Sequence, residues 1–184
     1  MGYSIELYFD PLFEEKIYRL WDDLAKSGVP SILQQIGSRP HLSLAVLETI
    51  DEIEVPGLLE GFIRSYARFF IEFNAFGLIP GDRQAVFLAP VPGLSLLEMQ
   101  QSLYRLLHQS GYVPVERYKP DKWLPHCTIS KELSPSGALQ TIEICQNWSL
   151  TGTAGVVELG VIEFRPRREI QTLSLKSEGS MIKI

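Results

Sequence analysis

The chain has 184 residues, of which 45% are hydrophobic and 21% charged, and its formal net charge is −5 at neutral pH. This composition is that of an ordinary globular domain, and the acidic balance argues against a general nucleic-acid binder, which usually carries a surplus of bases. No apolar run approaches the roughly 20 residues of a membrane span. The first ten residues lack a signal-peptide pattern, and two cysteines are too few for a disulfide framework. We therefore expect a cytoplasmic protein that does not bind membranes.

The first half of the chain alternates strand and helix patterns. An aromatic, β-branched run predicts a strand at 3–9. Asp10 and Pro11 then predict a helix start, with an acidic N-cap and proline at the first helical position, and Gly28 predicts its end. There follow a strand at 40–47, a weaker helix at 56–69 and two strands within 71–91 joined by a Pro-Gly-Asp turn.

The second half repeats this order. Ser95 and Glu98 have the spacing of a capping box and predict a second amphipathic helix, which Gly111 ends. The remaining elements are expected as a strand at about 124–131, a helix at 134–148 and strand-like runs at 150–158, 160–165 and 169–176. The repeated order indicates an internal duplication.

These patterns predict an α+β fold. We expect residues 1–184 to form a single bilobal domain, whose first half spans about 1–80 and whose second half spans about 84–184. The two lobes are expected to be pseudo-symmetric, each an antiparallel-rich sheet with covering helices, around a central cleft.

A histidine motif occurs twice in matched frame. PHLSL at 40–44 and PHCTI at 125–129 contain two of the three histidines of the chain. Because side chains alternate along a strand, His41 and Ser43 are expected on one face, and His126, Thr128 and Ser130 on one face of the second strand. The intervening residues of each motif are then expected in the core, together with Val46 after the first motif.

If the halves pack about a pseudo-two-fold axis, the two imidazole–hydroxyl pairs meet across one cleft. Two histidines offer one base and one acid near neutral pH, and two hydroxyls offer hydrogen bonds to an anion. This set suits a phosphodiester, since one imidazole takes a proton from water, the other protonates the leaving oxygen, and the hydroxyls hold the nonbridging oxygens.

Other interpretations of these residues are weaker. No His-Glu-x-x-His motif or close cysteine pair is present, and hydroxyls are poor zinc ligands, so no metal and no cofactor are expected. His108 falls in the last turn of the second helix, where a cation interacts well with the helix dipole, and is expected to be structural. Cys127 should face the core, because it is adjacent to His126 on a strand.

The paired motifs resemble the two H-x-[T/S]-x signatures of the 2H phosphoesterase superfamily, which includes bacterial RNA 2′,3′-cyclic phosphodiesterases, also called 2′-5′ RNA ligases. The resemblance covers nearly the whole chain. It implies a metal-independent phosphodiesterase that acts on 2′,3′-cyclic phosphates or 2′-5′ linkages at nucleotide or RNA ends, with no DNA substrate expected. It also implies that His41 and His126 are catalytic and that Ser43 and Thr128 bind phosphate.

Several alternatives stay open from the sequence. Arg83, Tyr118 and Trp123 are candidate substrate contacts, and each is equally well explained as a turn cation or a packing aromatic. Bases gather at 116–123 and 163–169, where they form a solvated edge or guide a small phosphate.

The substrate could be RNA, a nucleotide or a cyclic ADP-ribose derivative. The rival function is a binding module that holds a nucleotide or RNA end without turnover, and pseudo-symmetry leaves acid and base unassigned.

Overall fold

A computed structural model describes residues 2–30, 32–164 and 166–177. The order of elements confirms the alternation expected from the sequence. The elements are β1 (Tyr3–Phe9), α1 (Pro11–Lys26), α2 (Ile32–Gln35), β2 (His41–Leu47), α3 (Glu54–Ile63), β3 (Phe69–Ile79), β4 (Gln84–Pro90), α4 (Leu94–Gln109), the 3-10 helix η1 (Glu116–Tyr118), β5 (Cys127–Leu133), α5 (Pro135–Gln146), β6 (Gly152–Phe164) and β7 (Arg167–Ser174).

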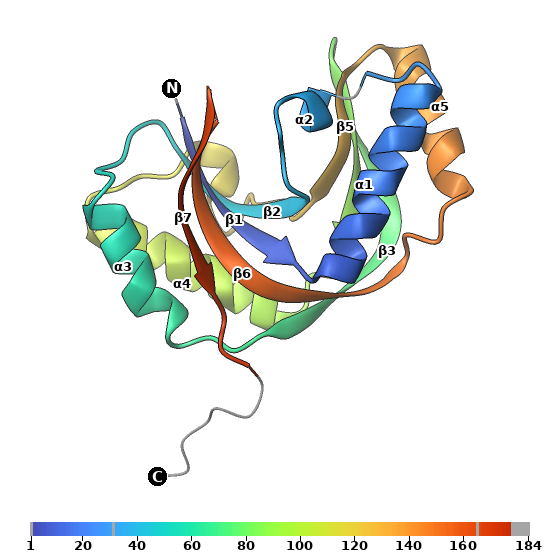
Figure 1. The fold of residues 1–184 in the computed structure, drawn as a ribbon. Coiled ribbons are helices and arrows are strands. Elements are labelled where there is room, and N and C mark those ends of the chain that lie inside the picture. Colours follow the sequence, from blue (N-terminus) through green and yellow to red (C-terminus); the bar gives the residue numbers. More distant parts are fainter. Residues whose placement is uncertain (1, 31, 165, 178–184) are drawn as a thin grey trace.

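The described strands form one strongly curved antiparallel sheet, so the α+β fold class is confirmed (Figure 1). Its order is β2-β1-β6-β3-β4-β5, and β7 pairs with β6 at the side of this path. The two expected sheets are thus joined, because β3 and β6 pair from Phe69↔Val156 to Phe73↔Gly152.

The two halves of the chain interlock within this sheet. β6 comes from the second half and pairs with β1, whereas β3 comes from the first half and pairs with β4. The helices also pack against elements of the other half of the chain. Helix α1 packs beside α5 and β5, and α4 packs on β2 (Figure 1). A boundary at about residue 80 in the sequence therefore does not separate the two parts of the sheet.

Helix α1 follows its sequence signals closely. The side chain of Asp10 accepts hydrogen bonds from the backbone N–H groups of Leu12 and Phe13, and Gly28 adopts a positive φ of 80° after the last turn. The apolar stripe of this helix is buried in the core, at Phe13, Ile17, Leu20, Trp21 and Leu24.

Two local predictions are wrong. Helix α4 begins at Leu94 with Gly93 as N-cap and no side-chain cap, so Ser95 and Glu98 do not form a capping box. The runs expected at 150–158 and 160–165 are one strand of 13 residues, β6, which is long because it pairs with β1, β3 and β7.

Each motif strand contains a β-bulge directly after its hydroxyl residue. In β2, Ser43 pairs with Glu6 and Ala45 with Ile5, so Leu44 is an extra residue. In β5, Thr128 pairs with Phe87 and Ser130 with Val86, so Ile129 is the equivalent extra residue. A bulge of this kind changes which face the following residues occupy.

The bulges correct the expected faces. Val46 was expected in the core beyond Leu44, but it lines the cleft. Ser130 was expected beside Thr128, but it is buried away from the cleft, and its hydroxyl donates to the Pro30 carbonyl at 3.1 Å. Lys131 lines the cleft instead.

Candidate active site

The two motif strands, β2 and β5, lie at opposite ends of the strand order. The sheet curves until β2 and β5 contact each other, and the thiol of Cys127 interacts with the backbone of His41. Cys127 is fully buried, as expected, and burial raises the pKa of its thiol to about 12. The contact brings the two histidines into one cleft.

This cleft has a volume of about 280 Å³. His41 and Ser43 line it from β2, and His126 and Thr128 line it from the start of β5. The structure therefore brings together the four residues that the sequence singled out.

Both imidazoles are held in the same orientation. The Nδ1 atom of His41 lies 2.6 Å from the carbonyl oxygen of Arg39, and the Nδ1 atom of His126 lies 2.7 Å from that of Leu124. Because a carbonyl only accepts, each Nδ1 carries a proton, and each Nε2 is the atom free to gain or lose one. The two histidines therefore share the same tautomer as well as the same sequence motif.

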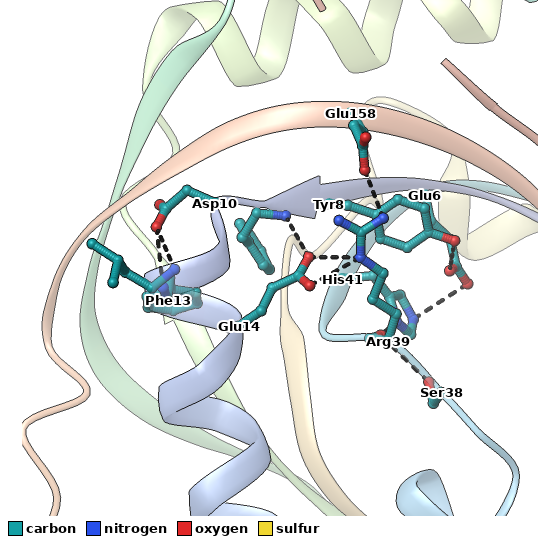
Figure 2. A network of polar contacts seen from close by, with 11 residues as sticks. Glu6, Tyr8, Asp10, Phe13, Glu14, Ser38, Arg39, His41 and Glu158 are labelled. Atoms are coloured by element: carbon teal, nitrogen blue, oxygen red, sulfur yellow. Dashed lines mark hydrogen bonds and ion pairs between the residues drawn. The ribbon is translucent and has the colours of Figure 1, made fainter. Parts of the chain in front are cut away.

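The surroundings of the two rings differ. Glu6 is 2% exposed, and its Oε1 lies 3.4 Å from the Nε2 of His41, so the two form an ion pair when that ring is protonated (Figure 2). Glu6 pairs with Ser43 in the sheet, and the equivalent partner of Thr128 is Phe87. The Phe87 ring lies edge-on to the ring of His126, with centroids 5.4 Å apart.

His126 is biased toward its neutral form. Burial lowers the pKa of His126 below its ordinary value, and the nearby charges of His41 and Arg117 lower it further, against the opposing effect of the hydrogen bond to Leu124. At neutral pH this imidazole can therefore accept a proton.

The two hydroxyls also have different partners. The Ser4 hydroxyl donates to the Ser43 hydroxyl oxygen at 3.1 Å, and Ser43 also interacts with the Tyr118 hydroxyl. Within the described residues, the Thr128 hydroxyl has no side-chain or backbone partner. The Thr128 hydroxyl can therefore donate to an anion without losing a partner, whereas Ser43 would exchange its contact with Tyr118 for one with the anion.

The three further candidate contacts lie in different places. Tyr118 is buried in η1 and lines the cleft beside Ser43. The indole N–H of Trp123 donates to the Ser43 carbonyl at 3.0 Å, so it supports β2 from outside the cleft. Arg83 is exposed at the β3–β4 turn, pairs with Glu132 at 3.1 Å, and is not brought to the histidines.

Sequence reasoning missed several residues that line the cleft. Ser4 and Glu6 were detectable, because they are polar residues on one face of the otherwise apolar run YSIELYF. Arg117 and Arg167 lie in the two basic segments but could not be separated there from their neighbours. Lys131 was missed because the bulge at Ile129 changes the face of the sheet on which it lies.

A partly buried ion network supports the loop before β2 (Figure 2). Arg39 lies between Glu14 and Glu158, at 2.8 Å and 2.6 Å, and its guanidinium stacks 4.2 Å from the centre of the Tyr8 ring. Since the Arg39 carbonyl accepts from His41, this network helps to hold the first imidazole in place.

The described residues contain neither a candidate membrane span nor a candidate metal site. No helix in this part of the chain is both long and apolar enough to cross a bilayer. Over residues 2–30, 32–164 and 166–177, no three His, Cys, Asp or Glu side chains gather as a metal site.

The curved α+β sheet and the duplicated histidine–hydroxyl strands define a 2H phosphoesterase. The profile of the 2′-5′ RNA ligase superfamily matches residues 15–167, so the chain belongs to this superfamily. Its general class of activity is therefore that of a phosphodiesterase. Comparison with curated proteins gave no match.

Solved structures share the fold at low sequence identity. E. coli LigT complexed with 3′-AMP is 14% identical, with a TM-score of 0.64 over 94% of this chain and 97% of that chain. The same protein complexed with NADP+ gives 14%, a TM-score of 0.58, and coverage of 95% and 96%. TT0787 of Thermus thermophilus is 17% identical, with a TM-score of 0.61 over 97% of this chain and 100% of that chain.

Proposed function

We propose that the protein hydrolyses a 2′,3′-cyclic phosphate or a 2′-5′ phosphodiester at the end of a nucleotide or RNA. The observation that carries this proposal is the pair of imidazoles that line one cleft, each with Nδ1 bound to a main-chain carbonyl and Nε2 free. One hydroxyl accompanies each ring. Such a pair can move two protons around one phosphorus atom.

In the proposed reaction, water attacks phosphorus while one imidazole takes its proton. The bond from phosphorus to the leaving ribose oxygen breaks, and the second imidazole, as imidazolium, protonates that oxygen. Each proton transfer is typically worth about 10²–10⁴-fold in rate. Ser43 and Thr128 donate to the nonbridging oxygens, where negative charge increases in the transition state.

The unequal surroundings of the rings support an assignment of the two roles. His126 is the base, because burial and its positively charged neighbours favour the neutral ring. We assign His41 as the acid, because the Glu6 carboxylate lies 3.4 Å from its Nε2 and forms an ion pair with the ring when it is protonated. This assignment uses Glu6 and Phe87, the strand partners of Ser43 and Thr128, of which only Glu6 carries a charge.

A nucleotide is the favoured substrate class. LigT, which shares the fold, has been solved with 3′-AMP and with NADP+, and both ligands are nucleotides. A protein of net charge −5 is also better suited to a short substrate than to long RNA.

The test is a turnover panel of nucleoside 2′,3′-cyclic phosphates and 2′-5′ dinucleotides. The natural sequence and a His108→Ala control, altered on the exposed last turn of α4, should hydrolyse at least one of them equally well. His41→Ala should lower kcat/KM by about 10²-fold or more. If no compound is hydrolysed, the protein is a binding module rather than the proposed enzyme.

A further inference from the structure

Glu6 and Tyr8 lie on one face of β1, beside the first motif strand. In the sheet Glu6 pairs with Ser43, and Tyr8 pairs with His41. The Tyr8 hydroxyl donates to Oε2 of Glu6 at 3.0 Å, and Oε1 of the same carboxylate lies 3.4 Å from Nε2 of His41 (Figure 2). The Glu6 carboxylate therefore connects a phenol to the atom at which His41 gains or loses its proton.

Tyr8 belongs to the interior of the protein. It is fully buried, and it is not among the described residues that line the cleft. The Arg39 guanidinium, held by Glu14 and Glu158, lies 4.2 Å from the centre of its ring. At Gly160 on β6, a Cβ atom would lie 2.8 Å from the Tyr8 hydroxyl oxygen, closer than real contacts of this kind. These neighbours fix the direction in which the phenol points.

The Tyr8 phenol remains a hydrogen-bond donor near neutral pH. Burial raises its pKa well above the ordinary value, and the charge and hydrogen bond of Glu6 raise it further. A protonated phenol has one proton to donate, and Oε2 of Glu6 accepts it. One oxygen of the carboxylate is therefore always occupied by Tyr8, and the other faces His41.

The distance from Glu6 to His41 decides how the carboxylate acts on the ring. A charge-assisted N–H···O hydrogen bond is about 2.7–2.9 Å long, and the separation of 3.4 Å exceeds this length. At 3.4 Å the carboxylate forms an ion pair with the protonated ring without a short hydrogen bond to the Nε2 proton. In the proposed reaction that proton passes to the leaving ribose oxygen, so a short hydrogen bond to Glu6 would compete with the reaction.

We propose that Tyr8 is a positioning residue, whose hydroxyl holds Glu6 at ion-pair distance from His41 and keeps the carboxylate from binding the Nε2 proton. This inference rests on the proposed function for the role of His41 as the acid. Without the hydroxyl, Oε2 loses its partner. The terminal torsion of a glutamate is soft, so the carboxylate can then turn and bring an oxygen within hydrogen-bond distance of Nε2.

Crystal structures of the natural sequence and of Tyr8→Phe test this positioning without any turnover. The variant removes the hydroxyl and keeps the ring beside Arg39. At about pH 5, where an ordinary histidine is protonated, the distance from Oε1 of Glu6 to Nε2 of His41 should exceed about 3.2 Å in the natural protein. In Tyr8→Phe a Glu6 oxygen should approach Nε2 to about 2.7–2.9 Å. A short hydrogen bond in the natural protein, or an unmoved carboxylate in the variant, overturns the proposal.

Kinetics on the substrate found in the turnover panel give a second test. Tyr8→Phe should lower kcat about 10-fold and leave KM unchanged, because Tyr8 does not line the cleft. Tyr112→Phe is the matched control, since it removes a phenol that donates to Glu54 at 2.6 Å outside the cleft, and it should leave kcat unchanged. A rise in KM with kcat unchanged in Tyr8→Phe overturns the proposal.

A double-mutant cycle separates positioning from a purely structural role. In a Glu6→Gln background, Tyr8→Phe should change kcat little, because the hydroxyl acts through the carboxylate. An equal loss in both backgrounds shows that Tyr8 supports only the fold, which overturns the proposal. If the protein hydrolyses nothing, the proposed function is contradicted, and the two crystal structures still decide whether Tyr8 holds Glu6 away from His41.

Discussion

Thr128 presents a hydroxyl to the cleft with no partner among the described residues, whereas its counterpart Ser43 accepts from Ser4. Thr128→Val keeps the shape of the side chain and removes the donor. A hydrogen bond to a charged group is worth roughly 1.5–3 kcal/mol, so kcat/KM should fall about 10- to 100-fold. Steady-state kinetics measure this change. Thr128→Ser should keep most of the activity, and an unchanged rate in the valine variant would show that the hydroxyl serves only the sheet.

In the proposed mechanism Glu6 gives the two histidines unequal roles, which predicts how the rate depends on pH. The rate should rise with pH as His126 loses its proton, at a pH below the ordinary histidine value because its pKa is lowered. It should fall again at higher pH as the acid loses its proton.

Glu6→Gln removes the carboxylate that pairs with protonated His41 and keeps an acceptor for the Tyr8 hydroxyl. The value of kcat/KM at its pH optimum should therefore fall, while the acidic limb, which His126 sets, stays in place. Glu48→Gln, at an exposed acid just after β2, serves as the control. A shift of the acidic limb instead would reverse the assignment of acid and base.

At the scale of elements, Asp10 connects β1, α1 and β6. Its Oδ1 caps α1, and its Oδ2 accepts from the backbone N–H of Gly155 at 2.7 Å. Asp10→Ala loses both contacts, so the free energy of unfolding should fall by about 1–3 kcal/mol in urea titrations. Asp10→Asn can replace one contact and should lose less. If both variants had the same free energy of unfolding as the natural sequence, neither the cap nor the hydrogen bond to β6 would contribute to stability.

Helix α1 and the motif strands were predictable, because a capping acid, an apolar stripe and strand alternation are local signals. The bulges at Leu44 and Ile129 were not, since an extra residue shows itself only in the pairing with a neighbouring strand. For that reason Lys131 was missed and Ser130 was placed on the wrong face. The length of β6 likewise depends on partners far apart in the sequence.

At the scale of the whole molecule, the halves of the chain exchange strands and helices. β6 pairs with β1, and α1 packs on β5, so neither sequence half can complete its sheet alone. We therefore expect one cooperative unfolding transition, with fluorescence of the tryptophans and circular dichroism giving coincident curves. Two separate transitions would indicate lobes that fold independently.

The proposed reaction needs both imidazoles at one phosphorus atom, so the most direct measurement is a double-mutant cycle. His41→Ala and His126→Ala should each lower kcat/KM by about 10²-fold or more on the substrate found in the turnover panel. The double variant should lose little beyond the worse single variant, because acid and base act as one unit. Losses that multiply in the double variant, or near-normal turnover in either single variant, would contradict the two-histidine mechanism.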